Sequence, residues 1–312
     1  MRLPTRTNGL SHLALLAITL SFTSSAVHAQ QSCDRACLRQ ALDTYMAAVF
    51  KHDPAAARLT DDHFATENTA SVKNGDGFWK EFSGYGAVNR GFFDPLNGSA
   101  AFLGVLKQTA GPDKIASVRI LVTAGRISEA EWIVASQGPG GRGEANPAGL
   151  AQYPPPAGVL AASERTPRFM MKSLANDFYQ AVADHYGEWV PNEPDCYRVE
   201  NGGGKAPAAA ASDSMLMPPV PKEGCLGNFE AFDQGTKDIA LRRFPVIDEE
   251  AGVVLCSVVF VRYPGSGRQD NLVNEYILIR NGRIAAWWTS MYFLPLGSPV
   301  TSGWENRHWI RR

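Results

Sequence analysis

The chain has 312 residues, of which 45% are hydrophobic and 20% are charged, and its formal net charge is -1. This composition can build substantial cores, and it lacks the basic footprint of a nucleic-acid-binding protein. Nucleic acid is therefore not an expected partner. Roughly 280 residues remain when a leader segment is set aside, a length that favours two domains over one.

The leader segment, residues 1–29, has the three-part pattern of a secretory signal peptide. Arg2 and Arg6 supply positive charge, residues 13–22 (LALLAITLSF) are apolar, and the segment ends on a small-x-small site (VHA). We expect a periplasmic or secreted mature protein without a membrane segment. The alternative is a membrane anchor, but the apolar run is about half of the roughly 20 residues that a bilayer needs.

The first half of the mature chain is predicted to begin with helices and continue as strands. Apolar side chains recur at helical spacing at Leu38, Leu42, Tyr45 and Val49, and a second short helical stretch follows. Apolar runs then predict strands over residues 102–106, 117–122 and 130–135.

The second half repeats this order. Leu174, Phe178, Ala181 and Val182 have helical spacing, and the expected strands cover residues 253–262, 274–279 and 285–292. Ala124-Gly125 in the first half and Asn281-Gly282 in the second are hairpin signals. Helices followed by a hairpin-linked sheet predict an α+β fold in each half.

The two halves also match each other directly. Residues 45–68 (YMAAVFKHDPAAARLTDDHFATEN) align without a gap on residues 178–201 (FYQAVADHYGEWVPNEPDCYRVEN). Farther on, RILVTAGRI (119–127) aligns with YILIRNGRI (276–284). The repeat indicates a duplicated domain. The expected domains are 30–137 and 166–300, joined by a Pro/Gly-rich linker over 138–165 and followed by a tail over 301–312.

Five cysteines in an exported chain suggest disulfides with one thiol to spare. We expect bridges between Cys33 and Cys37 and between Cys196 and Cys225, while Cys256 lies in an apolar strand and is interpreted as a core residue. A metal site is the alternative, although no paired Cys/His spacing of the zinc type is present.

The segments DDHFATEN (61–68) and NGDGFWKEFSG (74–84), followed by long hairpin strands around GRI, carry a family likeness. They resemble the nuclear transport factor 2-like superfamily, most closely its SnoaL-like polyketide-cyclase branch. The likeness covers about residues 33–136 and, more weakly, 166–295. The arrangement also resembles an uncharacterised domain family of exported bacterial and fungal proteins.

This resemblance implies that each half is a cone, in which a bent antiparallel sheet wraps around N-terminal helices and leaves a pocket at its mouth. Members include ketosteroid isomerase, scytalone dehydratase, limonene epoxide hydrolase and polyketide cyclases, and others are non-catalytic binding or dimerisation modules. Many members pair through their sheets, so the two halves of this chain are candidates for an intramolecular pseudo-dimer. Fold alone decides no function.

No hydrolase elbow, phosphate-binding loop, dinucleotide fingerprint or zinc-protease motif occurs in the sequence. We therefore expect no cofactor and no metal. Enzymes of the cone type need a group that moves a proton and a hydrogen-bond donor for developing charge. In the first half we expect His63 or Glu67 as the base, Tyr45 as the donor and Trp79 as a pocket wall.

Each candidate also has a structural alternative. Tyr45 can be a core aromatic, and His63 and Glu67 can lie on a solvated edge. Further ligand-binding candidates are Arg119, Glu131, Tyr179, Glu200, Arg243 and Trp287. Arg119 and Glu131 can line the pocket or occupy the outer face of the sheet. Arg243 can bind a ligand carboxylate or pair with the acidic residues just after it.

Glu67-Asn68 and Glu200-Asn201 form the polar pair that is present in both halves, either as a shared strand-end hydrogen bond or as a shared pocket acid. The predicted function is an exported small-molecule pocket protein, a cofactor-independent isomerase, dehydratase or hydrolase for a small apolar or polyketide-like compound, with the first half active. The alternative is a non-catalytic ligand-binding or assembly module.

Overall fold

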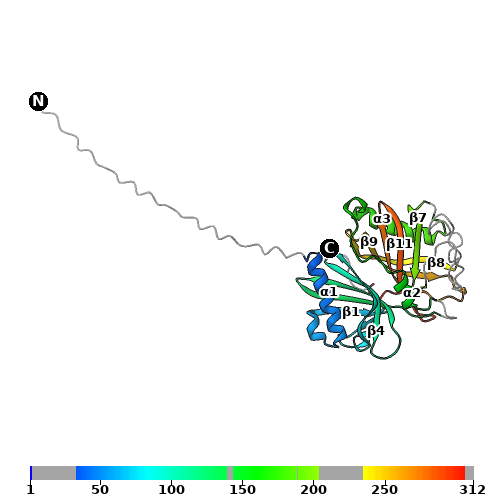
Figure 1. Ribbon diagram of the computed structural model, residues 1–312, viewed down its shortest axis with the longest axis horizontal. Coiled ribbons are helices and arrows are strands. Elements are labelled where there is room, and N and C mark those ends of the chain that lie inside the picture. The colour runs from blue at the N-terminus through cyan, green and yellow to red at the C-terminus, as the bar shows by residue number, and fades with distance from the viewer. Residues whose placement is uncertain (2–32, 139–142, 188, 204–234, 306–312) are drawn as a thin grey trace. The chain divides into compact units, whose positions relative to one another are not determined.

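The computed structural model describes Met1 and residues 33–138, 143–187, 189–203 and 235–305. Ser32–Arg312 form one compact unit. The predicted signal peptide, apart from Met1, lies outside the described residues. Within the compact unit, each half carries one long helix and one sheet (Figure 1), which confirms the α+β class.

The first copy begins with helix α1 (Arg35–Phe50), whose N-terminus is capped by Asp34. The predicted apolar stripe is confirmed, since Leu38, Leu42, Tyr45 and Val49 are all buried. The 3-10 helix η1 (Pro54–Ala57) then leads to the first strand, and η2 (Gly77–Lys80) precedes the third.

The first sheet has the order β2-β1-β6-β5-β4-β3. Strands β3 to β6 are joined by three antiparallel hairpins, so β6 runs opposite to β3, and β1 pairs with β6 in parallel. The sheet is thus mixed, not purely antiparallel as expected. Its strands are β1 (Leu59–Glu67), β2 (Ala70–Val72), β3 (Phe82–Asp94), β4 (Ser99–Gln108), β5 (Lys114–Thr123) and β6 (Arg126–Val134).

The second copy starts at helix α3 (Arg168–Ala183) and has the sheet order β7-β11-β10-β9-β8. Here too the first strand pairs in parallel with the last, β7 with β11. The strands are β7 (Asn192–Glu200), β8 (Thr236–Asp248), β9 (Val253–Arg262), β10 (Asn271–Arg280) and β11 (Arg283–Phe293).

The structure confirms the sequence repeat, because equivalent elements have equivalent bounds. Helix α3 is displaced from α1 by 133 residues at both ends (35 to 168 and 50 to 183), and β7 is displaced from β1 by the same number (59 to 192 and 67 to 200). The displacement is 154 for β8 and β9 against β3 and β4 (82 to 236 and 99 to 253), and 157 for β10 against β5 (114 to 271).

Local backbone geometry is repeated as well. The predicted hairpin turns have left-handed backbones at both central residues, with φ of 49° and 74° at Ala124 and Gly125 and of 51° and 69° at Asn281 and Gly282. These values fit the tight two-residue turns that match the twist of a hairpin. The turn positions were therefore predictable from short-range sequence alone.

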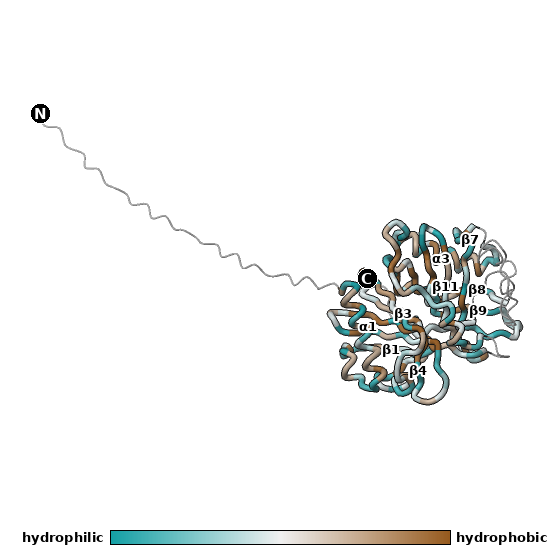
Figure 2. Tube along the Cα trace, in the orientation of Figure 1, coloured by the Kyte–Doolittle hydropathy of each residue, from teal (hydrophilic) through white to brown (hydrophobic). Residues whose placement is uncertain are grey.

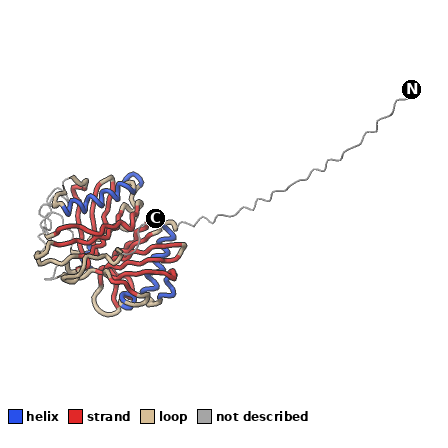
Figure 3. Tube along the Cα trace, turned by 180° about the vertical axis from the view of Figure 1, so that it is seen from behind, coloured by secondary structure: helices blue, strands red, loops and turns tan. Residues whose placement is uncertain are grey.

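Each helix packs on one face of its own sheet. The cluster around α1 contains residues from β3 to β6, and the cluster around α3 contains residues from β7 to β11. Figure 3 shows the long helices against the strands, and Figure 2 shows apolar stretches along the chain of the compact unit. We call these two packed faces the helix-facing sides of the sheets.

The opposite faces of the two sheets share a third apolar cluster, which joins the copies. It includes Val88, Phe92 and Leu103 from the first copy and Leu255 and Tyr276 from the second. A face of each sheet that would otherwise meet water is thereby buried against the other copy.

Two ion pairs are exchanged between the copies at this contact. Arg35 of α1 binds Asp248 of β8 at 2.6 Å, and its counterpart Arg168 of α3 binds Asp94 of β3 at 2.6 Å. Both aspartates are fully buried, and each also accepts a backbone N–H from the other copy. Reciprocal contacts of equivalent residues are the signature of a two-fold interface.

The predicted linker contains ordered structure that packs on the sheets. Helix α2 (Pro147–Gln152) buries Leu150 in the shared cluster, and the Tyr153 carbonyl accepts the Trp288 indole N–H at 2.8 Å. A 3-10 helix η4 (Ala162–Glu164) follows. The predicted tail is also partly packed, because Trp304 is buried.

Candidate functional site

The predicted first-copy residues Tyr45, Trp79 and Glu67 lie near one another on the helix-facing side. Tyr45 is fully buried on α1, and its hydroxyl accepts the Trp132 indole N–H at 2.9 Å. The Trp79 ring meets the Tyr45 ring edge-on at 5.5 Å. Burial raises the pKa of Tyr45 well above its ordinary value, and nearby Glu67 adds to the rise. Tyr45 therefore remains protonated and packed among indole rings.

Glu67 ends strand β1 and is only half-buried. Its carboxylate accepts the Phe78 backbone N–H at 2.8 Å, and the backbone of Gly77 passes so close that a Cβ there would stand 2.0 Å from the carboxylate. Burial raises the pKa of Glu67 to about 7, although the bond from Phe78 opposes the rise. Glu67 thus holds the turn at η2 and titrates near neutral pH. His63 lies four residues earlier on the strand and is half-exposed.

Strand pairing places Glu67 in a row that crosses the first sheet. Its neighbours in successive strands are Trp132, Val118 and Phe102. The equivalent row of the second sheet consists of Glu200, Thr289, Glu275 and Cys256. Glutamate is kept in the first strand of both rows, β1 and β7, whereas the three apolar side chains of the first copy are replaced by smaller or ionisable ones.

Glu275 is the central ionisable group of the second row. It is 2% exposed, and the Tyr179 hydroxyl of α3 donates to its carboxyl at 2.7 Å. Burial raises the pKa of Glu275 to about 8; the Tyr179 bond and the charge of Arg198 oppose this rise, while Glu200 adds to it. A neutral carboxyl at pH 7 keeps a proton that it can donate.

Arg198 and Glu200 flank this group from strand β7. They alternate with Val199, so both side chains lie on the helix-facing side with Cys196. Burial lowers the pKa of Arg198, and burial raises the pKa of Glu200 while Arg198 lowers it. Tyr179, Arg198, Glu200 and Glu275 therefore form a mixed titratable cluster in the second copy.

Tyr179 and Glu200 are among the ligand-binding candidates predicted from the sequence, and Glu275 is among the second-half residues whose types suggest a pocket, whereas Arg198 and Thr289 were not predicted. The internal repeat indicates that Glu275 is unusual. When RILVTAGRI is aligned with YILIRNGRI, the residues just before these segments are Val118 and Glu275. A glutamate in an apolar position of a repeated strand is unusual when the other copy shows that the fold needs none. Trp287, also a candidate, is buried and meets Phe178 edge-on at 4.8 Å.

Arg119 and Glu131 lie on the opposite face of the first sheet, away from Tyr45, and Arg243 of β8 meets them from the second sheet. Arg243 of the second copy reaches Glu131 at 2.5 Å, and Arg119 lies 3.3 Å from the same carboxylate. Trp304 covers both guanidinium groups, whose centres are 4.6 Å and 5.9 Å from its ring. The two arginines hold the pKa of Glu131 below its ordinary value against the effect of burial. The cluster joins the copies, and Glu131 is a partner that the sequence did not indicate for Arg243.

The repeated Glu-Asn pair separates into two roles. The Asn68 side chain accepts the Val134 backbone N–H at 2.8 Å, and the Asn201 side chain accepts the equivalent N–H of Met291 at 2.7 Å. The asparagines therefore provide the shared strand-end hydrogen bond. The glutamates point to the helix-facing rows.

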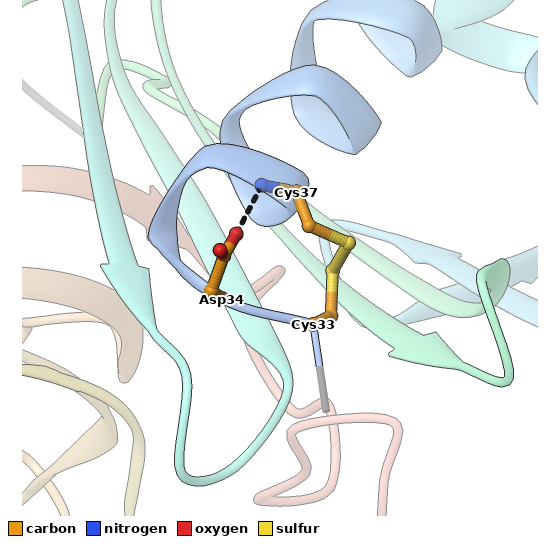
Figure 4. Close-up of a disulfide and its surroundings, with 3 residues drawn as sticks. All are labelled: Cys33, Asp34 and Cys37. Atoms are coloured by element: carbon orange, nitrogen blue, oxygen red, sulfur yellow. Dashed lines mark hydrogen bonds between the residues drawn. A yellow bond between two sulfur atoms is a disulfide. The ribbon is translucent and has the colours of Figure 1, made fainter. Parts of the chain in front are cut away.

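The predicted bridge between Cys33 and Cys37 is present, and it closes the first turn of α1 beside the Asp34 cap (Figure 4). Cys196 is disulfide-bonded, while Cys225, its predicted partner, lies outside the described residues. Cys256 is a buried free thiol whose pKa is raised well above its ordinary value by burial. It is therefore a core residue and not a nucleophile.

A pocket of about 120 Å³ opens between α1 and the β5–β6 turn, and Cys37, Thr44, Arg58 and Val122 are among the residues that line it. It touches none of the predicted site residues other than Cys37. In the described parts of the chain, no cluster of three or more His, Cys, Asp or Glu residues is arranged to hold a metal ion. None of the helices described is both long and apolar enough to cross a membrane.

Residues 164–290 match a family model described as "Domain of unknown function (DUF8021)". The match begins just before α3 and ends within β11, so it falls on the second copy and includes the titratable cluster. No curated protein matches the chain.

Proposed function

We propose that this protein is a small-molecule pocket protein that carries out cofactor-independent acid–base chemistry. The reaction is an isomerisation, dehydration or hydrolysis, and the substrate is a small apolar or polyketide-like compound. Each copy is proposed to be a cone of the nuclear transport factor 2-like, SnoaL-like type. A long helix packed on one face of a sheet in each copy supports this assignment.

The observation that carries the proposal is the glutamate retained at the end of the first strand in both copies, β1 and β7. Glu67 and Glu200 end equivalent strands, both are partly exposed, and both have a raised pKa, which is about 7 for Glu67. A group that titrates near the working pH is the most effective general acid or base, because both of its protonation states are populated. Glu67 also holds the turn at η2, but that role does not need a pKa near neutrality, and the adjacent asparagines supply the strand-end bonds.

A second candidate function, a non-catalytic binding or assembly module, is favoured by the packing of the first copy. Tyr45, Trp79 and Trp132 are all at most 1% exposed, and both indole rings lie against Tyr45. Close aromatic packing of this kind stabilises a core. In this second candidate function, the first copy is a structural domain that stabilises the second copy.

The two copies are further proposed to form an intramolecular pseudo-dimer. The exchanged Arg35–Asp248 and Arg168–Asp94 pairs support this idea, because reciprocal contacts arise when two equivalent domains meet about a two-fold axis.

Export to the periplasm or the exterior is proposed from the leader sequence of residues 1–29. The Cys33–Cys37 disulfide supports it, because disulfides persist mainly in oxidising compartments.

The function is tested with protein purified from its native compartment. Mass spectrometry identifies any retained small molecule, which is then offered to wild type and to Glu67→Gln, Glu200→Gln and His63→Ala variants. Asp62→Asn and Asp195→Asn are matched controls, since these exposed aspartates occupy equivalent strand positions five residues earlier. We expect the two control variants to convert the compound as wild type does. At least one glutamate variant should bind the compound without converting it. Binding without turnover by wild type would leave the non-catalytic module as the function.

A further inference from the structure

We propose that the pocket between α1 and the β5–β6 turn of the first copy is a binding site for a small monocarboxylate. The apolar body of this ligand is about the size of one aromatic ring, and its carboxylate is held by Arg58. The pocket has a volume of about 120 Å³. This site goes beyond the proposed acid–base function, takes part in none of its steps and is tested without turnover.

The pocket lies along the flank of α1. On the helix it is lined by Cys37, Ala41 and Thr44, whose spacing of four and then three residues places them in one stripe. The buried stripe that packs on the sheet and carries Tyr45 is a different, neighbouring one. Neither Tyr45 nor Glu67 lines the pocket, so it is separate from the groups proposed for proton transfer.

The second copy shows that the same fold can fill this space with its own side chains. At a displacement of 133 residues (41 to 174 and 57 to 190), Leu174 and Val190 take the positions of Ala41 and Ala57. Both larger side chains are buried in the core of the second copy. The two alanines of the first copy leave unfilled the volume that leucine and valine occupy in the second.

The hairpin turn above the pocket differs between the copies in the same way. In the second copy Met170 replaces Cys37, and its sulfur lies 3.6 Å from the point where a Cβ would stand on Gly282. At the equivalent Gly125, no atom of the described residues beyond the turn itself lies within 4 Å of that point. Cys37 is bonded to Cys33 instead. The turn is therefore packed in the second copy and open in the first.

Arg58 brings a positive charge to the pocket. It is an exposed lining residue, and its backbone is left-handed with a φ of 53°, which is unfavourable for a residue with a side chain. Its counterpart is Pro191, since the two carbonyls accept the N–H groups of Ile127 and Ile284 at 3.0 Å each. Proline fixes φ at a negative value, so the fold can make this connection without a left-handed residue. Within the described ranges of the chain, no ion pair involves Arg58.

The lining determines the class of ligand. Val122 and Ile127 are buried and form an apolar floor together with Ala41 and Ala57. Engineered apolar cavities of about 150 Å³ bind benzene, so a single ring is close to the largest body that this pocket accepts. A guanidinium matches the two oxygens of a carboxylate, and no acidic side chain is among the described residues that line the pocket. The charges and the volume together favour an aromatic or short branched monocarboxylate.

The test is a fluorine NMR titration of the full mature protein with 4-fluorobenzoate. We expect saturable binding to wild type and none to Ala41→Leu, which installs the second-copy residue in the pocket. Ala47→Leu is the matched control, because it adds the same volume at an exposed position of the same helix and should bind as wild type does. Arg58→Asn keeps a residue that tolerates the left-handed backbone and should weaken binding by about fivefold. Arg58→Lys should weaken it less.

Two further measurements locate the site and establish its selectivity. In wild type, the backbone amide resonance of Gly125 should shift on titration, which requires no variant to fold. The neutral 4-fluorobenzyl alcohol should bind more weakly than 4-fluorobenzoate. Circular dichroism establishes that each variant is folded.

The site is overturned by any of four results: no saturable binding to wild type, an unshifted Gly125 amide, equal affinity for the alcohol, or unchanged binding by a folded Ala41→Leu or Arg58→Asn variant. Since none of these readouts depends on turnover, their failure is distinct from failure of the turnover test on Glu67 and Glu200.

Discussion

The Asn274 side chain donates a 2.9 Å hydrogen bond to the Ser117 hydroxyl, and these two residues occupy the same position in the two copies. A second equivalent pair behaves alike, because the Ser290 hydroxyl donates to the Ile133 carbonyl at 2.8 Å. Residues that contact their own counterparts lie next to a two-fold axis. In the proposed pseudo-dimer the two sequences have diverged, so a donor and an acceptor can face each other where identical chains would present the same group twice.

The exchanged ion pairs predict equal effects from equivalent mutations. Asp94→Asn and Asp248→Asn should each lower the free energy of unfolding by about 2–4 kcal/mol, since each leaves an arginine and a buried backbone N–H poorly paired. Urea denaturation measures the change. Glu249→Gln, at a side chain 47% exposed, is the control and should have little effect. Strongly unequal losses for the two aspartates would contradict the two-fold description.

The raised pKa of Glu275 leads us to predict that the free energy of unfolding falls as pH rises. Its pKa in the folded protein, about 8, lies above the ordinary 4.5, so the folded state binds the proton more tightly. The resulting stabilisation is complete below pH 4.5 and is lost as pH rises through 8, with a total on the order of 4 kcal/mol. Glu275→Gln should flatten the decline between pH 5 and 8 in denaturation curves. Asp195→Asn should leave the decline as it is, because that aspartate is exposed.

Trp304 predicts that the C-terminal segment contributes to the fold. Trp304→Ala removes a ring that covers Arg119 and Arg243, meets Phe64 edge-on and donates to the Thr66 hydroxyl at 2.9 Å. The expected loss is about 3 kcal/mol, as for other buried large-to-small changes. Differential scanning calorimetry should show a lower Tm. Trp189→Ala, at a residue 46% exposed, should shift the Tm much less.

The Cys33–Cys37 disulfide predicts a modest stabilisation. It spans a sequence separation of four residues, and closing so short a loop restricts the unfolded chain by about 2 kcal/mol. A Cys33→Ala, Cys37→Ala double variant should therefore unfold at lower urea concentration with the same m value. Because Asp34 still caps α1, its far-ultraviolet circular dichroism should match that of wild type. A variant as stable as wild type would contradict the expectation.

Local features were predictable from the sequence because their causes are local. The buried stripe of α1 follows from a 3.6-residue period, and the turn at Asn281-Gly282 follows from the left-handed backbone that these residues adopt. The alignment of the two halves was also sufficient to predict that α1 and α3 are equivalent helices. Strands β3 and β8 were missed because both are edge strands, interrupted by register shifts, and their polar residues conceal the alternation.

Long-range relationships could not be predicted from local patterns. The parallel pairing of β1 with β6 joins residues 65 to 68 positions apart (67 to 132 and 59 to 127), and Arg35 meets Asp248 across 213 positions. Arg119 and Glu131 were left undecided between two faces, since alternation fixes which residues share a face but not which face receives the helix. The hydrogen bond between Tyr179 and Glu275 could be predicted only if the position of α3 against the second sheet were already known.

The exchanged pairs also bear on the order in which the chain matures. Asp94 is made early in synthesis, but the groups that neutralise and bond it, Arg168 and the Ile247 N–H, are made much later. The first copy therefore leaves the ribosome with a carboxylate and an apolar sheet face still open to water. Because native contacts of the first copy need groups of the second, we expect the two copies to reach the native state together although they are synthesised one after the other.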